Sequence, residues 1–124
     1  MNSSPARVLV VDDNEALRDN LAEALQLEGF TVAVAPNAEA ALDQLAKEPP
    51  PRVVLLDYML PGISGADLLA RIRKDPRLAG VRVVMTTGSV GIRSLTASAD
   101  AILMKPFGVR ELLVALKKVG VGGP

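Results

Sequence analysis

Short apolar runs alternate along this chain with segments of helical periodicity, and this alternation is the feature that most limits its fold. Each run has four or five residues, about the length of a strand, and is apolar almost throughout. Near-continuous apolar runs are typical of strands buried on both faces of a parallel sheet. The runs are 8–11, 31–35, 53–56, 81–85 and 101–104. The alternation predicts an α/β fold with right-handed crossovers.

The segments between the runs carry helical signals. Apolar side chains recur at helical spacing in each of them. Asn37 and Ser64 stand at N-cap positions, and Gly29 and the prolines at 49–51 mark helix ends. The predicted helices are 14–28, 37–47, 64–73, a short one between residues 87 and 101, and 109–119.

The predicted elements form one domain from residue 7 to residue 119. A chain of 124 residues with 49 % hydrophobic residues can fill a single core. Residues 1–6 are predicted to be an N-terminal arm and 120–124 a flexible tail or linker. Because the sequence starts at Met1, we expect a stand-alone domain rather than a piece of a longer protein.

The composition excludes several kinds of chemistry. The sequence contains no histidine and no cysteine, which excludes Ser-His-Asp catalysis, histidine metal sites and thiolate zinc sites. The formal net charge is zero, so no basic field indicates a nucleic acid or a membrane surface as a partner. No apolar run approaches the roughly 20 residues of a membrane span, and the start lacks the apolar core of a signal peptide. We therefore expect a cytoplasmic protein.

Polar residues stand where four of the predicted strands end. They are Asp12 and Asp13 after the first strand, Asp57 after the third, Thr86 and Thr87 after the fourth, and Lys105 after the fifth. In open α/β sheets, ligands bind beyond the carboxyl ends of the strands, where the strand order reverses. With strand order 2-1-3-4-5, the first and third strands are neighbours. The three aspartates are then expected to converge.

Such a site would carry an excess of negative charge. Three carboxylates and one lysine give −3 + 1 = −2, and crowded carboxylates are stabilised by a cation. Oxygen ligands suit Mg²⁺, with Mn²⁺ as a possible substitute. Because Mg²⁺ bridges carboxylate and phosphoryl oxygens, the pattern indicates phosphate chemistry.

Four stretches in this frame resemble the response-regulator receiver domain of two-component signalling, of the stand-alone, chemotaxis-regulator type. They are VLVVDDNE, VVLLDYMLPGISG, VVMTTG and ADAILMKPF, in the family's order, and they span Val8 to Phe107. The resemblance implies a three-layer, doubly wound, flavodoxin-like fold around a five-stranded parallel sheet of order 2-1-3-4-5. It also implies a regulatory phosphoacceptor that catalyses only its own phosphorylation and dephosphorylation.

The resemblance implies a role for each polar side chain. Asp57 would accept a phosphoryl group from the phosphohistidine of a sensor histidine kinase or histidine phosphotransfer protein. Asp12 and Asp13 would hold Mg²⁺ together with Asp57, Asp13 directly and Asp12 directly or through water. The backbone carbonyl of Met59 would complete the metal shell. Lys105 would contact the acceptor carboxylate and then the phosphoryl oxygens.

The resemblance also implies a conformational switch. Thr87 would supply the switch hydroxyl, with Thr86 as the alternative, because adjacent strand residues point to opposite faces. Gly88 would leave room for the backbone to approach the phosphate. The bond between Lys105 and Pro106 would be cis.

Two features depart from the family pattern. Ile102 stands where receivers commonly carry a tyrosine or phenylalanine that moves with the switch hydroxyl, and an isoleucine would shift the equilibrium less. The interval from Thr87 to Lys105 is shorter than usual by about one helical turn, which shortens the helix after Thr87. That helix, the strand 101–104 and the helix 109–119 form the face where a downstream partner is expected. We expect a monomer or a weak dimer.

Two other functions stay open. A receiver-like interaction module that is never phosphorylated would usually lack the acceptor or the lysine, and both are present here. A haloacid-dehalogenase-type phosphatase also uses a nucleophilic aspartate and Mg²⁺. It needs D-x-D after the first strand, where this chain has Asp12, Asp13 and Asn14.

Overall fold

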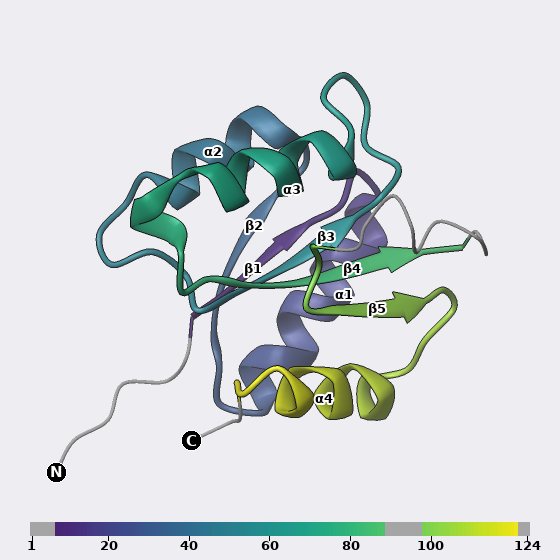
Figure 1. Ribbon diagram of the computed structural model, residues 1–124. Helices are drawn as coiled ribbons and strands as arrows, with labels where there is room; N and C mark the ends of the chain where they lie inside the picture. The colour runs from purple at the N-terminus through teal and green to yellow at the C-terminus, as the bar shows by residue number, and fades with distance from the viewer. Residues whose placement is uncertain (1–6, 89–97, 122–124) are drawn as a thin grey trace, which may run out of the picture.

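In the computed structural model, which describes residues 7–88 and 98–121, a five-stranded parallel sheet lies between two layers of helices (Figure 1). The strands are β1 (Arg7–Val11), β2 (Thr31–Ala35), β3 (Val53–Asp57), β4 (Arg82–Thr87) and β5 (Ala101–Met104). Their order, β2-β1-β3-β4-β5, confirms the predicted topology. Because every neighbouring pair is parallel, the carboxyl ends of all five strands lie at one edge of the sheet.

The helices follow the predicted segments. They are α1 (Glu15–Leu27), α2 (Ala38–Leu45), α3 (Gly65–Lys74) and α4 (Val109–Lys118), with a 3-10 turn at Pro76–Leu78. In Figure 1, α2 and α3 cover one face of the sheet, and α1 and α4 cover the other. The short helix predicted between residues 87 and 101 falls mostly on residues 89–97, which lie outside the described residues. None of the helices in the described residues is long and apolar enough to cross a membrane.

The three central strands, β1, β3 and β4, are buried on both faces of the sheet, as their near-continuous apolar runs predict, whereas the edge strands β2 and β5 are only partly buried. Leu9 of β1 packs in the cluster that contains Leu68 of α3. The next residue, Val10, packs in the opposite cluster with Leu25 of α1 and Leu112 of α4. Burial of each such leucine contributes about 1.5–3 kcal/mol. The two clusters make the sheet a rigid support for the residues at its carboxyl edge.

Two strands extend farther toward this edge than predicted. Asp57 is the last residue of β3, and Thr86 and Thr87 are the last two of β4. The Tyr58 N–H donates to the Thr86 carbonyl at 2.9 Å, and the Lys105 N–H donates to the Thr87 carbonyl at 2.7 Å. The backbone pairing therefore continues to the polar residues, which are held by the sheet rather than by loops.

The packed part of the chain also extends past residue 119. The Val121 N–H donates to the Leu116 carbonyl at 2.9 Å, and the Val121 side chain is buried in the cluster between the sheet, α1 and α4. Gly120 allows the chain to turn back onto α4, because its φ of 85° suits a glycine. Val121 therefore belongs to the core, although the tail was predicted to begin at residue 120.

A glycine lets α3 start close to the end of β3. A Cβ atom built on Gly65 would lie 2.3 Å from the backbone oxygen of Asp57, far closer than atoms can approach. The Gly65 N–H instead donates to the Tyr58 carbonyl at 3.1 Å. Any side chain at residue 65 would push α3 away from the segment that carries Asp57.

Candidate functional site

Three carboxylates converge at the carboxyl edge of the sheet. Asp12 and Asp13 follow β1, Asp57 ends β3, and one oxygen from each lies within 4.8 Å of the other two. This arrangement confirms the predicted convergence. Asp12 and Asp57 are 3 % and 4 % exposed, whereas Asp13 is exposed. The site is an acidic pocket with two buried carboxylates and one at the solvent.

Asp12 is held at four of its atoms. Its N–H donates to the Ala35 carbonyl at 3.2 Å. Its carboxylate accepts the Asn14 N–H at 2.9 Å on Oδ1 and the Lys105 Nζ at 3.1 Å on Oδ2. Its backbone carbonyl accepts Nη1 of Arg18 at 3.0 Å. These contacts orient both its carboxylate and its peptide group. The contact with Arg18 was not predicted, and the only signal for it in the sequence is an arginine in the helix that follows the acid pair.

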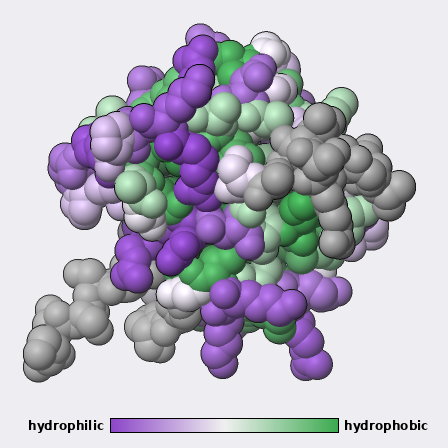
Figure 2. Space-filling view, in the orientation of Figure 1, coloured by the Kyte–Doolittle hydropathy of each residue, from purple (hydrophilic) through white to green (hydrophobic). Residues whose placement is uncertain are grey.

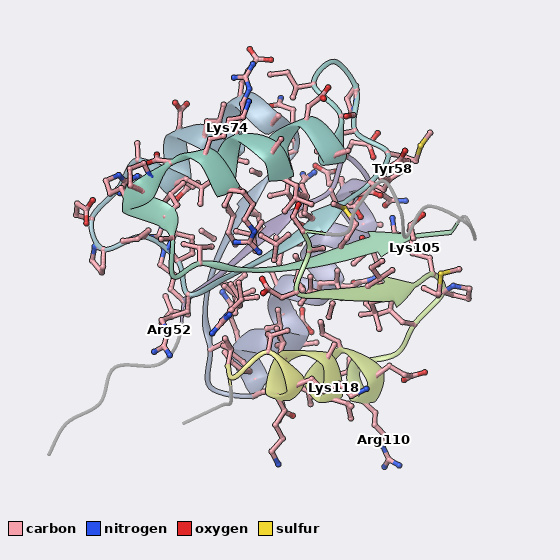
Figure 3. All side chains as sticks on the ribbon, viewed as in Figure 1. Arg52, Tyr58, Lys74, Lys105, Arg110 and Lys118 are labelled. Carbon is pink, nitrogen blue, oxygen red and sulfur yellow. The ribbon has the colours of Figure 1, made fainter. Side chains whose placement is uncertain are left out.

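Asp57 is held from two sides. Its Oδ1 accepts the Met59 N–H at 3.1 Å, and its Oδ2 lies 3.4 Å from Nζ of Lys105. The side chain of Met59 is itself 66 % exposed. In Figure 3, Tyr58 and Lys105 lie at the same end of the sheet, and Arg52 lies at the opposite end.

One lysine bridges the two buried carboxylates. Nζ of Lys105 lies 3.1 Å from Oδ2 of Asp12 and 3.4 Å from Oδ2 of Asp57. The sequence predicted the contact with Asp57 but not the one with Asp12, because β1 and β5 are not neighbours in the sheet. The long side chain spans that gap. The peptide bond between Lys105 and Pro106 is cis.

The pKa values of Asp57 and Lys105 both lie above their usual values, for different physical reasons. Burial raises the pKa of Asp57; the hydrogen bond from Met59 lowers it, the charge of Asp12 raises it, and the net pKa lies above its usual 3.8. Burial by itself lowers the pKa of Lys105. The hydrogen bond to Asp12 and the charges of Asp57 and Asp12 outweigh that effect, so this pKa also lies above its usual value. A further cation would therefore be stabilised here.

The donor set fits a hard divalent cation. Carboxylate oxygens are the ligands that Mg²⁺ prefers, and the group Asp12, Asp13 and Asp57 is an acidic site typical of Mg²⁺. The four α-helices of residues 7–88 and 98–121 each follow the carboxyl end of a strand, so their N-terminal turns lie at the same edge. These turns carry Glu15, Glu39, Asp67 and Glu111. These four acidic side chains add negative charge at the edge that carries the pocket.

Two buried threonines of β4 lie beside Asp57. Thr86 is the register partner of Asp57, and the Thr87 carbonyl accepts the Lys105 N–H. Thr86 is 4 % exposed and Thr87 is 1 % exposed. The choice of Thr87 as the switch hydroxyl stays a prediction. A Cβ atom on Gly88 would meet nothing within 4 Å, so there is open space at that position among the described residues.

Comparison with known proteins agrees with this geometry. The family model of the response regulator receiver domain matches residues 8–117, and the chain belongs to this family. It is therefore a phosphoacceptor module of two-component signalling with an acidic metal pocket, and a regulatory domain rather than an enzyme. Receiver domains have histidine kinases as partners.

Individual relatives show the same likeness. The chain is 36 % identical to response regulator MprA of Mycolicibacterium vanbaalenii, over 91 % of this chain and 49 % of MprA. The solved structure of TrrA from Thermotoga maritima in complex with Mg²⁺-BeF has a TM-score of 0.82 and 34 % identity, covering 92 % of this chain and 98 % of TrrA. The solved structure of chemotaxis protein CheY4 from Vibrio cholerae has a TM-score of 0.85 and 27 % identity, covering 92 % of this chain and 98 % of CheY4. The chain spans about half the length of the curated relatives it matches.

Proposed function

We propose that Asp57 accepts a phosphoryl group from a phosphohistidine of a sensor histidine kinase or a histidine phosphotransfer protein. The observation that carries this proposal is the burial of Asp57 between Lys105 and the acid pair Asp12 and Asp13. A carboxylate oxygen of Asp57 attacks phosphorus, and the new P–O bond forms as the P–N bond to the donor imidazole breaks. The imidazole keeps the bonding electrons and takes up a proton. The donor is a separate domain or protein, because this chain has no histidine.

The neighbours of Asp57 stabilise the charge that moves during this transfer. We expect Asp12, Asp13, Asp57 and the carbonyl of Met59 to hold Mg²⁺, or Mn²⁺ in its place. When bound, the ion neutralises charge on the phosphoryl oxygens. Nζ of Lys105 already lies between the two buried carboxylates. A small movement brings it to the phosphoryl oxygens, where it acts as a point charge.

The proposed output runs from β4 to β5. The phosphoryl group adds a charge of about −1.5 to −2, which we expect to attract the hydroxyl of Thr87. The Lys105 N–H donates a hydrogen bond to the Thr87 carbonyl at 2.7 Å, so we expect a movement of β4 to displace the end of β5. There, Ile102 lines a groove of about 710 Å³ between β5 and α4. Figure 2 shows hydrophobic patches bordered by hydrophilic side chains on this side of the molecule.

The proposed partners use two different surfaces. A depression of about 380 Å³ beside the acidic pocket is lined by Leu17, Lys105, Pro106 and Phe107, and its apolar side chains suit contact with the phosphodonor. The groove between β5 and α4 is the expected contact for the downstream partner. We propose no direct contact with nucleic acid or membrane, and a monomer or weak dimer. A cytoplasmic location belongs to this proposal, because phosphohistidine is made where kinases use ATP.

Acetyl phosphate tests the proposed transfer without a partner. The protein is incubated with it in Mg²⁺ or in EDTA, and the intact mass is measured. One phosphoryl adduct in Mg²⁺ and none in EDTA is the expected result, because Mg²⁺ stabilises the charge in transfer. No adduct in either condition would instead support an interaction module that is never phosphorylated.

The side chain of Met59 predicts a long-lived phosphoryl group. It stands two residues after Asp57 and is largely exposed, so it lines the approach of water, and its thioether is a weak acceptor that does not orient a water molecule. We expect a lifetime of minutes or longer, and a lifetime shorter by roughly tenfold for Met59→Asn, whose amide can orient water. The decay of the adduct, followed by intact mass after removal of acetyl phosphate, measures both. A half-life of seconds in the parent protein would refute the prediction.

A further inference from the structure

Arg18 of α1 is a second basic residue in contact with the acid pair, and the proposed transfer does not use it. Its Nη1 donates to the backbone carbonyl of Asp12 at 3.0 Å. Its Nε is buried and has no hydrogen-bond partner among the described residues. An arginine that served only the helix would extend its guanidinium into water. Arg18 instead turns back to the loop that precedes α1.

The contact acts on the peptide unit between Asp12 and Asp13. This unit is planar and contains the Asp13 nitrogen and Cα. A hydrogen bond that holds the Asp12 carbonyl therefore also fixes the orientation of the bond from the Asp13 nitrogen to its Cα. On the other side of Asp13, the N–H of Asn14 donates to Oδ1 of Asp12 at 2.9 Å. Asp13 therefore lies between two restrained groups. Its own side chain is exposed and makes no hydrogen bond or ion pair within the described part of the chain.

We propose that Arg18 is a positioning residue for the metal site. By holding the Asp12 carbonyl, it directs the Asp13 carboxylate toward the space shared with Asp12 and Asp57. The planar guanidinium suits this task, because its donors have a fixed geometry. The inference rests on the proposed function, since it takes the acidic pocket to be a Mg²⁺ site.

Two roles for Arg18 predict opposite effects on Mg²⁺ binding. If Arg18 acted only through its charge, it would repel a cation, and its removal would make Mg²⁺ bind more tightly. If it acts by positioning Asp13, its removal makes Mg²⁺ bind more weakly. Residues that orient metal ligands typically change metal affinity by about 10–100-fold. The sign of the change therefore distinguishes positioning from charge.

Three variants carry the test. Arg18→Met removes the donor and the charge but keeps an aliphatic chain, and Arg18→Lys keeps the charge and one donor group. Arg71→Met removes the same groups from an exposed position of α3. Mg²⁺ affinity is measured in the full chain by the fluorescence of Tyr58, its single tyrosine, and by the rise of Tm with Mg²⁺. We expect Mg²⁺ to bind about tenfold more weakly to Arg18→Met than to the parent protein. The affinity of Arg18→Lys should lie between those two, and Arg71→Met should bind Mg²⁺ like the parent.

The outcomes separate this inference from the proposed function. A purely structural role would lower the Tm in EDTA but leave the Mg²⁺ concentration at half effect unchanged, and that result would overturn the inference. Unchanged or tighter binding by Arg18→Met, or equal weakening in Arg71→Met, would do the same. If Arg18→Met does not fold, Arg18→Lys is measured in its place, and unchanged or tighter Mg²⁺ binding by Arg18→Lys overturns the inference. A parent protein that binds Mg²⁺ but takes no phosphoryl group refutes the proposed transfer and leaves the Arg18 comparison intact; one that binds no Mg²⁺ refutes both.

Discussion

Asp57→Asn is expected to abolish the phosphoryl adduct that acetyl phosphate forms in Mg²⁺. The amide is not a nucleophile toward phosphorus, and no other carboxylate in the pocket lies at the end of β3 with the Met59 N–H and Lys105 beside it. The asparagine keeps an oxygen that can accept the Met59 hydrogen bond, so the fold is retained. Intact mass measures the loss. The matched control is Asp67→Asn, an exposed aspartate in the first turn of α3, which should be modified like the parent.

The same variant is expected to be more stable than the parent protein in EDTA. The raised pKa of Asp57 means that its carboxyl stabilises the fold most when protonated, below its usual pKa of 3.8, and that this contribution is lost as pH rises through the raised value. The asparagine of the variant does not ionise, so the variant keeps this contribution as pH rises. Its advantage should therefore be absent in acid and grow toward neutral pH, to about 1 kcal/mol or roughly 3–5 °C in Tm. Lys105 keeps Asp12 as a partner at 3.1 Å.

Two results would contradict this account. An adduct on Asp57→Asn would show that another carboxylate is the acceptor. A variant that is less stable than the parent at neutral pH in EDTA would show that the ion pair between Lys105 and Asp57 stabilises the fold by more than burial of the charge destabilises it.

Asp13→Ala is expected to separate stability from metal binding. The Asp13 side chain is exposed and makes no hydrogen bond or ion pair in the described residues, so its loss should leave the Tm in EDTA unchanged or slightly raised, within about 0.5 kcal/mol. Because it removes one of three carboxylates from the pocket, the rise of Tm with Mg²⁺ should disappear. Phosphorylation in Mg²⁺ should slow by about a hundredfold or more.

A neighbouring acid provides the control for Asp13→Ala. Glu15 lies in the first turn of α1 and is exposed, but it is not in the group of three carboxylates. Glu15→Ala should therefore bind Mg²⁺ nearly as well as the parent. If Asp13→Ala bound Mg²⁺ normally, or if both variants lost it equally, the acid pair would not be the metal site that we describe.

The periodicity of the sequence was sufficient to predict the strands and the helices of the described residues, and the resemblance to receiver domains supplied the sheet order. The apolar runs have the length of strands. They lack the alternation of apolar and polar residues that is typical of a sheet with one solvent-exposed face, so they indicated a parallel sheet. Capping residues such as Asn37 and Ser64 marked helix starts because a side-chain oxygen replaces a missing backbone acceptor. Strand ends were less predictable. Thr86 and Thr87 belong to β4 because hydrogen bonds from neighbouring segments extend the pairing.

By itself, the sequence determined which groups could form the site and near which edge of the sheet they would lie. Asp12, Asp13 and Asp57 follow from the position of acids at strand ends, which is local information combined with strand order. Tertiary structure alone decided that Lys105 bridges two carboxylates and that Arg18 holds the Asp12 carbonyl. Both contacts depend on where a long side chain ends after several bond rotations. For Lys105 that position is set by packing of elements distant in the chain, and for Arg18 by the side-chain conformation that returns its guanidinium to the loop before its own helix.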